Sequence, residues 1–493
     1  MVLKQLDKRR LSPLMREIAN NWLYDEKTLV ENLAKEAKLS EQAHKEVQKK
    51  AADLVTSVRK TRLSKSGLDA FMAKYDLSSE EGIVLMCLAE ALLRIPDKLT
   101  ADKLIKDKLT SANWQEHLGD SEHLFVNAAT WCLMLTGKIL KPVKTHKRFS
   151  GVFKNFLDKR SRPVIRRAVM QAMKILGQQY VMGETIEKVL KRAKEKEKQG
   201  FSYSYDMLGE AAVTMADADF YDRAYQQAIE AIGKAATEQS VRKNPGISVK
   251  LSALHPRYEL AKADRVHREL YPKLLKLVML AKAHQIGLNI DAEESERLEL
   301  SLTLIARLAR EKTLAGFEGI GIVVQAYQKR AGLVLDYLID LAKDTGHRFM
   351  IRLVKGAYWD AEIKQAQVEG LAGYPVFTRK CYTDVAYQAC VKKLFANVAH
   401  VYPQFATHNA YTVAMVMQFA GDFKTMSFSA FTGWAMRFMT RLSEKPMRFL
   451  VGFMRRLAPI SIFCLILSGA CLKMAQIPLL LIELLMRRPQ LSA

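Results

Sequence analysis

The chain of 493 residues lacks the cysteine and glycine patterns that mark many ligand sites. Its few cysteines form no Cys-x-x-Cys pair, which argues against a cysteine-held metal and fits a reducing compartment better than a secreted scaffold. No P-loop and no Gly-x-Gly-x-x-Gly motif follows a predicted strand. Neither a P-loop nor a Rossmann nucleotide site is therefore indicated.

Long apolar segments are also missing. The N-terminal residues 1–10 carry charge but lack the apolar core of a signal peptide, so we expect a cytoplasmic protein. The longest apolar run, Leu457 to Leu472, falls short of the ~20 residues that span a bilayer. A membrane-associated fragment anchored by this run is the weakest of the alternatives.

Acidic residues are scarce relative to basic ones, and the formal net charge is +24. Such a charge is typical of proteins that bind nucleic acid or anionic membranes. In segments such as 187–198, however, Lys and Arg are interleaved with Glu, as on a solvated helix face. A basic, non-catalytic helical binding protein nevertheless remains an alternative to an enzyme.

The pattern changes along the chain. Residues 1 to about 180 predict helices; Ser78 to Glu81, for example, form a capping box before the apolar stretch 82–95. From about residue 200, short strands alternate with helical segments in the rhythm of βα units. The predicted strands are 203–206, 247–251, 288–291, 319–325, 349–354 and 404–408. We therefore predict an α/β fold: a helical N-terminal domain, then an incomplete TIM-like (β/α)₈ barrel with about six of its eight units.

Polar side chains stand at the carboxyl ends of these strands, where TIM barrels build active sites. In chain order they are Asp206 with Glu210, Lys250, Asp291 with Glu293 and Glu294, Gln325 with Tyr327, Arg352 with Lys355 and Tyr358, and Thr407 to Asn409. A buried Arg requires an anionic or electron-rich partner, so the Arg352 strand is the most informative of the six. We expect these groups to meet in one pocket of mixed charge.

The residues alone leave the chemistry open. His408 has no second His or Cys at ligand spacing, so no metal site is predicted. Asp291 and the following glutamates suit acid/base work, yet acidic residues at such positions also serve to pair Lys and Arg.

Five long motifs narrow the choice. They are Ser204-Tyr-Asp-Met-Leu-Gly-Glu210, Ser248-Val-Lys-Leu-Ser-Ala-Leu-His-Pro-Arg-Tyr258, Asn289-Ile-Asp-Ala-Glu-Glu294, Arg352-Leu-Val-Lys-Gly-Ala-Tyr-Trp-Asp360 and Phe405-Ala-Thr-His-Asn-Ala410. These motifs resemble the proline dehydrogenase domain of the bacterial proline utilization A family. Residues 81–97 resemble the segment before that family's barrel, and the resemblance extends to about Lys424.

The resemblance implies FAD-dependent oxidation of L-proline to 1-pyrroline-5-carboxylate, with electrons passing to a membrane quinone and a peripheral position on the inner face of the cell membrane. It implies catalytic roles for Lys250, Asp291, Arg352 and Tyr358, cofactor contacts from Gln325, Arg352, Lys355 and His408, and substrate contacts from Glu210, Lys250, Asp291 and Tyr358. A fixed cation near the flavin ring stabilises its reduced form.

Two modules of the family's longer members are not recognised in the sequence: a ribbon-helix-helix DNA-binding module and an aldehyde dehydrogenase. DNA binding is therefore not expected, and glutamate formation would require a separate 1-pyrroline-5-carboxylate dehydrogenase. The predicted domains are a helical accessory domain (1–180), the incomplete barrel (181–424) and a tail unrelated to the family (425–493).

The tail suggests a reading-frame error. If Gly469 to Ala475 are encoded GGC GCC TGC TTG AAA ATG GCG, a one-base shift reads Arg-Leu-Leu-Glu-Asn-Gly, the substrate-clamping helix that the family should supply. We predict that residues 425–493 are an out-of-frame translation after a one-base loss near codon 424, and that the literal chain has impaired activity.

Overall fold

A computed structural model describes residues 12–63, 181–183, 185–198, 201–207, 211–421, 426–431 and 450–457. The described residues within 12–61 and 182–457 belong to one compact unit. Glu210, the capping box at 78–81 and most of the tail lie outside the described residues.

Eight parallel strands form a closed ring. They are β2 (Phe201–Met207), β3 (Gly246–Val249), β4 (Leu288–Ile290), β5 (Ile320–Gln325), β6 (Phe349–Val354), β7 (Val401–Ala406), β8 (Ser427–Phe431) and β9 (Leu450–Leu457). Each strand pairs with the next in this order, and β9 pairs with both β8 and β2. A short strand, β1 (Val181–Gly183), extends the sheet beside β9.

The predicted TIM-like α/β fold is confirmed, and all six predicted strands exist. Each of β2 to β7 is followed by at least one described helix, which gives the six strand–helix units expected. The tail differs from expectation, because β8 and β9 follow Lys424 and occupy the seventh and eighth positions of the ring. The prediction missed them because residues 425–493 show no strand–helix rhythm. The two strands nevertheless pair with β7 and β2, because strands at an open edge of a sheet expose unpaired N–H and C=O groups.

Helices alternate with the strands along the chain. They are α10 (Ile186–Glu197), α11 (Met215–Ala235), α12 (Ala263–Glu269), α13 (Tyr271–Ala283), α14 (Leu298–Ala309), α15 (Ala331–Thr345), α16 (Trp359–Val368), α17 (Lys380–Phe395) and α18 (Ala410–Ala420). A capping box between Thr214 and Asp217 starts α11, and Gly346, at φ +69°, ends α15 in the left-handed conformation.

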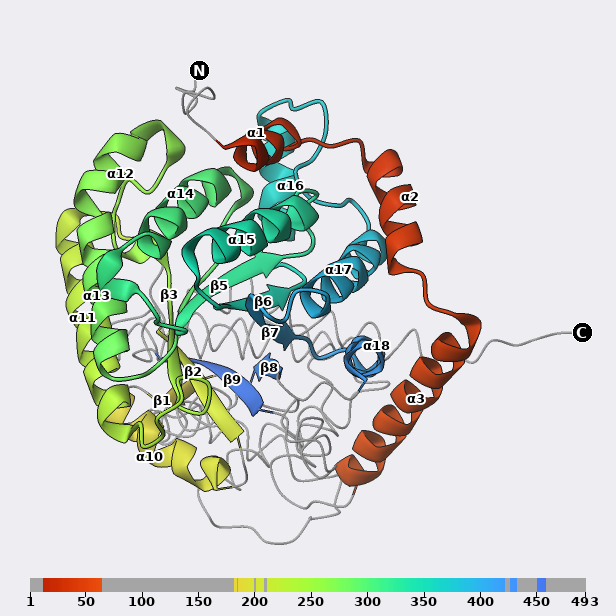
Figure 1. Ribbon diagram of the computed structural model, residues 1–493, viewed down its shortest axis with the longest axis horizontal. Coiled ribbons are helices and arrows are strands. Elements are labelled where there is room, and N and C mark those ends of the chain that lie inside the picture. Colours follow the sequence, from red (N-terminus) through yellow and green to blue (C-terminus); the bar gives the residue numbers. More distant parts are fainter. Residues whose placement is uncertain are drawn as a thin grey trace, which may run out of the picture. The chain divides into compact units, whose positions relative to one another are not determined.

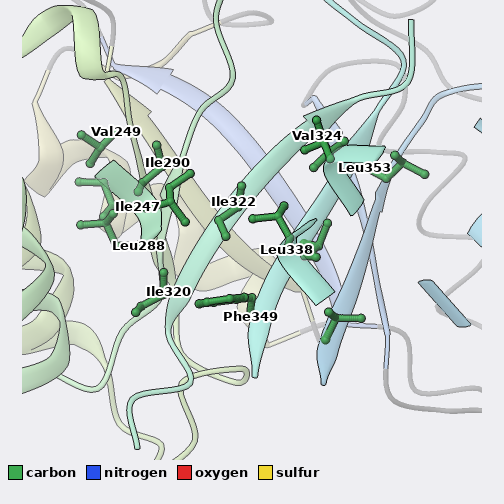
Figure 2. Packing of buried hydrophobic residues seen from close by; sticks show 14 of the residues in the cluster. Ile247, Val249, Leu288, Ile290, Ile320, Ile322, Val324, Leu338, Phe349 and Leu353 are labelled. Atoms are coloured by element: carbon green, nitrogen blue, oxygen red, sulfur yellow. The ribbon is translucent and has the colours of Figure 1, made fainter. Parts of the chain in front are cut away.

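Alternation of side chains along the strands separates the core from the barrel interior. Figure 2 shows aliphatic residues of β3, β4, β5 and β6, such as Ile247 and Ile322, packed together and against Leu338 of α15. Residues one position away, such as Ser248 and Arg352, must point to the opposite side of the sheet, because successive side chains of a strand alternate. The apolar face of the sheet therefore packs against the helices, and the opposite face is available to form a site.

Three N-terminal helices lie along the outside of the barrel: α1 (Pro13–Asn20), α2 (Glu26–Ala37) and α3 (Glu41–Leu63). Helix α1 contacts α15, and α2 contacts α17. Figure 1 shows α2, in red, beside α17, in blue. Side-chain bonds add to the packing: Gln388 donates to the carbonyl of Ala37, and Lys50 donates to Gln418. Within the described residues, no helix has both the length and the hydropathy needed to cross a membrane.

Candidate active site in the barrel

The interior of the barrel is polar on neighbouring strands. Asp206 of β2 is in register with Ser248 of β3, which is in register with Asn289 of β4. All three are at most 2% exposed. The next position, Gly321 of β5, makes room for this layer, because a Cβ atom there would lie 2.2 Å from Asn289 Oδ1. Barrel interiors are usually filled by bulky aliphatic residues, so this polar layer indicates a functional site.

Arg352 of β6 is the largest buried cation of this interior. It is 1% exposed, and its guanidinium donates to Ser248 Oγ and to Ser204 Oγ, each at 2.9 Å. Asp291 Oδ1 lies 3.8 Å from Nη1. Burial lowers the pKa of Arg352, while the carboxylates of Asp291 and Asp206 oppose that change.

Lys250 follows β3 and is held between two carboxylates. Its Nζ atom lies 2.9 Å from Asp291 Oδ2 and 3.2 Å from Asp206 Oδ1, and the residue is 4% exposed. Its backbone N–H donates to the hydroxyl of Tyr225 on α11. Together with Arg352, this creates a buried group of two cations and two carboxylates, in which Asp291 faces both cations.

The turn after β6 is tied closely to the end of β5. The backbone N–H of Tyr327 donates to the carbonyl of Lys355 at 2.7 Å, and Gln325 Oε1 accepts from the N–H of Ala357 at 3.1 Å. Gly356, at φ +150°, lies against the ring of Tyr327, where a Cβ atom would come within 2.3 Å. This turn delivers half-buried Tyr358 to the start of α16.

Gln325 spans two loops. Besides accepting from Ala357, its Nε2 donates to the carbonyl of Glu293, after β4, at 2.8 Å. The amide is therefore engaged on both atoms by loops flanking β5. This arrangement makes Gln325 a brace between the turns that follow β4 and β6.

Two of the predicted cofactor residues lie just after strands β6 and β7. Lys355 Nζ lies 2.6 Å from Asp384 Oδ1 on α17, and burial lowers its pKa. His408 follows β7 and is half-buried; burial lowers its pKa to about 4, so its imidazole is neutral at pH 7. Glu210 lies outside the described residues.

The cluster includes two residues to which the sequence interpretation gave no role. Ser204 and Ser248 hold the guanidinium of Arg352, whereas Asp206, which was expected in the pocket, pairs with Lys250. A signal was present, because Ser204 and Ser248 each precede a charged strand-end residue, Asp206 or Lys250, by two positions. Residues two apart on a strand share a face.

The chemistry of the cluster is that of a charged, preorganised pocket. Buried donors and carboxylates at fixed distances bind and orient a charged or polar ligand without reorganising. Asn289 Oδ1 and Gln404 Oε1 are buried acceptors without a hydrogen-bond partner among the described residues. In the same part of the chain, no group of three or more His, Cys, Asp or Glu side chains is arranged to hold a metal ion.

Three sequence families match successive parts of the chain. Residues 12–59 match the Proline utilization A proline dehydrogenase N-terminal domain, and residues 67–180 match the family described as the DNA-binding domain of Proline dehydrogenase. Residues 189–454 match Proline dehydrogenase. The last match passes Lys424, where the resemblance was expected to end.

Curated relatives agree. The Bifunctional protein PutA of Klebsiella aerogenes is 54% identical over 406 residues, covering 81% of this chain and 31% of the relative. That of Rhizobium meliloti is 49% identical over 413 residues. Proline dehydrogenase 1 of Bacillus subtilis is 26% identical over 246 residues, covering 50% of this chain and 69% of the relative. The chain thus spans about a third of the length of the PutA relatives.

Solved structures show the same similarity. A mutant of Proline Utilization A from Bradyrhizobium japonicum matches with a TM-score of 0.69 and 41% identity, covering 90% of this chain and 44% of that chain. The family match over 189–454 includes the polar strand ends described above and more than half of the sequence. The chain belongs to the proline dehydrogenase family.

Proposed function

We propose that this chain oxidises L-proline to 1-pyrroline-5-carboxylate and uses FAD as its cofactor. The observation that carries the proposal is the buried guanidinium of Arg352, fixed by Ser204, Ser248 and Asp291 inside a barrel of this family. The family implies a flavin, and FAD is the form we propose. Oxidation removes a hydride from the ring carbon that is bonded to nitrogen and carries no carboxylate, and an N–H proton leaves to water. FAD, when bound, would supply the hydride acceptor.

The donor set of the pocket suits such a cofactor. Arg352 provides a permanent cation, which stabilises the negative charge that a flavin gains on reduction. Asn289 and Gln404 provide buried acceptors without a partner among the described residues, and a flavin ring carries an N–H that can donate to such a group. His408 would contact the cofactor as a neutral imidazole, because its pKa is about 4.

The substrate side is assigned to the other charged residues. We propose that Lys250 and Asp291 orient proline, since both are buried and neither can turn without breaking a short ion pair. Tyr358 would pack against the substrate ring, and Glu210 would contact the substrate. Gln325 and Lys355 are kept as cofactor contacts; in Gln325, one amide hydrogen remains for that purpose after the bond to Glu293.

A direct experiment tests this function. The purified full chain is incubated with FAD, desalted and mixed anaerobically with L-proline or D-proline. We expect a yellow protein whose flavin absorbance is bleached by L-proline and not by D-proline. A yellow protein that L-proline does not bleach, or a colourless protein that stays inactive with added FAD, contradicts the proposal.

Partners and location follow from the same proposal. Electrons would pass to a membrane quinone, the protein would sit peripherally on the inner face of the cell membrane, and a separate 1-pyrroline-5-carboxylate dehydrogenase would complete conversion to glutamate. We also propose the domain limits 1–180, 181–424 and 425–493, with strands β8 and β9 of the last segment pairing with β7 and β2 of the barrel. Proline-dependent reduction of a quinone analogue, with and without lipid vesicles, tests the electron acceptor.

DNA binding is a second candidate function, favoured by the match of residues 67–180 to a DNA-binding domain and by the net charge of +24. The absence of a recognised ribbon-helix-helix module predicts the opposite. Retention on duplex DNA of different sequences, measured from 50 to 200 mM salt, tests whether the chain has a specific DNA-binding function. Binding through a basic surface alone falls steeply with salt and shows no sequence preference, whereas a specific DNA-binding domain prefers one sequence.

A further inference from the structure

A buried carboxylate on α16 lies outside the cluster described above. Glu362 is 7% exposed, and its two oxygens accept from the backbone N–H of Ser295 at 2.6 Å and from Ser295 Oγ at 2.7 Å. Burial raises the pKa of Glu362, and the two bonds from Ser295 oppose that change. Such a short, two-point attachment fixes both the position and the rotation of the helix that carries it.

The attachment joins the segments that follow two strands of the site. Ser295 stands four residues after Asp291 of the β4 end, and Glu362 stands one helical turn after Tyr358 at the β6 end. The first turn of α16 is formed, since the N–H of Glu362 donates to the carbonyl of Tyr358 at 2.9 Å. Any shift of Glu362 is therefore transmitted to Tyr358 through a rigid helical turn.

Ser295 is itself immobilised by other segments. Its carbonyl accepts from Arg330 Nη2 at 2.8 Å, and its hydroxyl accepts from Trp22 Nε1 at 3.4 Å. Arg330 is completely buried and paired with Glu299. Glu362 is thus held by an anchor that belongs to the barrel and is touched by the N-terminal segment.

We propose that Glu362 is a positioning residue: by binding Ser295, it holds α16 so that Tyr358 faces the site, and it thereby sets the affinity for substrate. This inference rests on the proposed function, because Tyr358 is a substrate contact only if proline is the substrate. A purely structural carboxylate is the competing explanation. That explanation does not account for a charged residue at this position, because an apolar residue of similar volume is often as stabilising as a buried charge.

The test compares four full-length variants loaded with FAD. Glu362→Ala removes the attachment, Glu362→Gln retains an acceptor and a donor for Ser295, and Ser295→Ala removes the hydroxyl alone. Leu338→Ala is the matched control, because it destabilises the core between α15 and the strands without touching either residue. Two readouts are taken: KM and kcat for L-proline, and deuterium uptake of the peptide 355–368.

We expect Glu362→Ala to raise KM about tenfold with kcat nearly unchanged, as a small displacement of a binding group does. Deuterium uptake of 355–368 should rise in the same variant, Glu362→Gln should restore most of both properties, and Ser295→Ala should lie between. Leu338→Ala should leave KM unchanged. Wild-type KM and uptake in Glu362→Ala, or an equal KM increase in Leu338→Ala, overturns the inference. If wild type does not respond to proline, the proposed function fails, and uptake of 355–368 alone decides whether Glu362 holds α16.

Discussion

Lys250 and Asp291 form a buried ion pair, with Nζ of Lys250 2.9 Å from Oδ2 of Asp291, although the two residues lie 41 positions apart in the chain. Parallel strands β3 and β4 bring them together at their carboxyl ends. Asp291 also faces Arg352, so a change at Lys250 alters the electrostatic surroundings of every charged member of the cluster.

Replacing Lys250 by Met should therefore destabilise the protein. The carboxylates of Asp206 and Asp291 would remain buried with one cation fewer, which costs about 3–5 kcal/mol of unfolding free energy in comparable pairs. Urea unfolding at neutral pH measures this change. Lys273→Met is the control, because its partner Asp219 is half exposed and such pairs contribute less than about 1 kcal/mol. Equal effects of the two substitutions would show that burial of the pair has no energetic importance.

Replacing Arg352 by Lys should slow flavin reduction about 100-fold, because an ammonium cannot donate to Ser204 and Ser248 in the same fork geometry. Stopped-flow absorbance after mixing with L-proline measures the rate. Arg348→Lys serves as the control, since Arg348 donates to the carbonyl of Val398 away from the cluster. A wild-type rate in Arg352→Lys would remove this residue from the proposed mechanism.

His408 should make stability depend on pH. Its pKa in the folded protein is about 4, below the usual 6.5, so the folded state favours the neutral ring. The stabilisation is complete above pH 6.5 and is lost as the pH falls through 4; its size is about 3 kcal/mol. We expect His408→Asn to flatten the fall in unfolding free energy between these pH values. Carboxylates elsewhere titrate alike in both proteins, so their contribution cancels when the two unfolding free energies are subtracted. If the unfolding free energies of wild type and His408→Asn change with pH in parallel, His408 is not the source of the pH dependence.

Gly356→Ala should disturb the turn before Tyr358. The new Cβ would lie 2.3 Å from the ring of Tyr327, at a φ of +150° that favours glycine. We expect a KM for L-proline raised by about tenfold, since Tyr358 is displaced. In Gly370→Ala, φ is +64° but nothing lies within 4 Å, so only backbone strain of about 1 kcal/mol is added. A KM increase of the same size in Gly370→Ala would show that backbone strain, not displacement of Tyr358, is responsible.

Sequencing the gene across codon 424 tests the reading-frame hypothesis. We expect that adding one base there restores Arg-Leu-Leu-Glu-Asn-Gly in the region of Gly469 to Ala475. Restoring the frame should also lower the KM for L-proline, because the substrate-clamping helix would then supply an Arg for its carboxylate. A shifted frame that lacks this segment would contradict the hypothesis.

Local patterns predicted much of the barrel. Short runs of β-branched, aromatic and other apolar residues predicted the six strands β2 to β7, and the strand-end rule predicted that Lys250, Asp291 and Arg352 would lie together. β7 begins at Val401 instead of at residue 404, so Pro403 lies inside the strand, in register with Ile351. Proline has no N–H to donate, and a single missing bond did not stop the strand.

The features that the sequence did not reveal depend on contacts between residues far apart in the chain. Strands β8 and β9 depend on pairing with β7 and β2, which no local window contains. The contact of Lys355 with Asp384 and that of Glu362 with Ser295 depend on helices whose rotation is set by packing. The roles of the site residues, including Lys355, His408 and Glu210, stay predictions until the variants are measured.

The N-terminal helices have a consequence for synthesis. Gln388 donates to the carbonyl of Ala37 across 351 positions of the chain, and Lys392 donates to that of Glu36 across 356. At about 5–20 residues per second, a ribosome needs roughly 20–70 s to make the partner helix after α2 has emerged. During that interval α2 lacks its docking surface, so the nascent chain must be shielded or remain unstructured until most of the barrel has been translated.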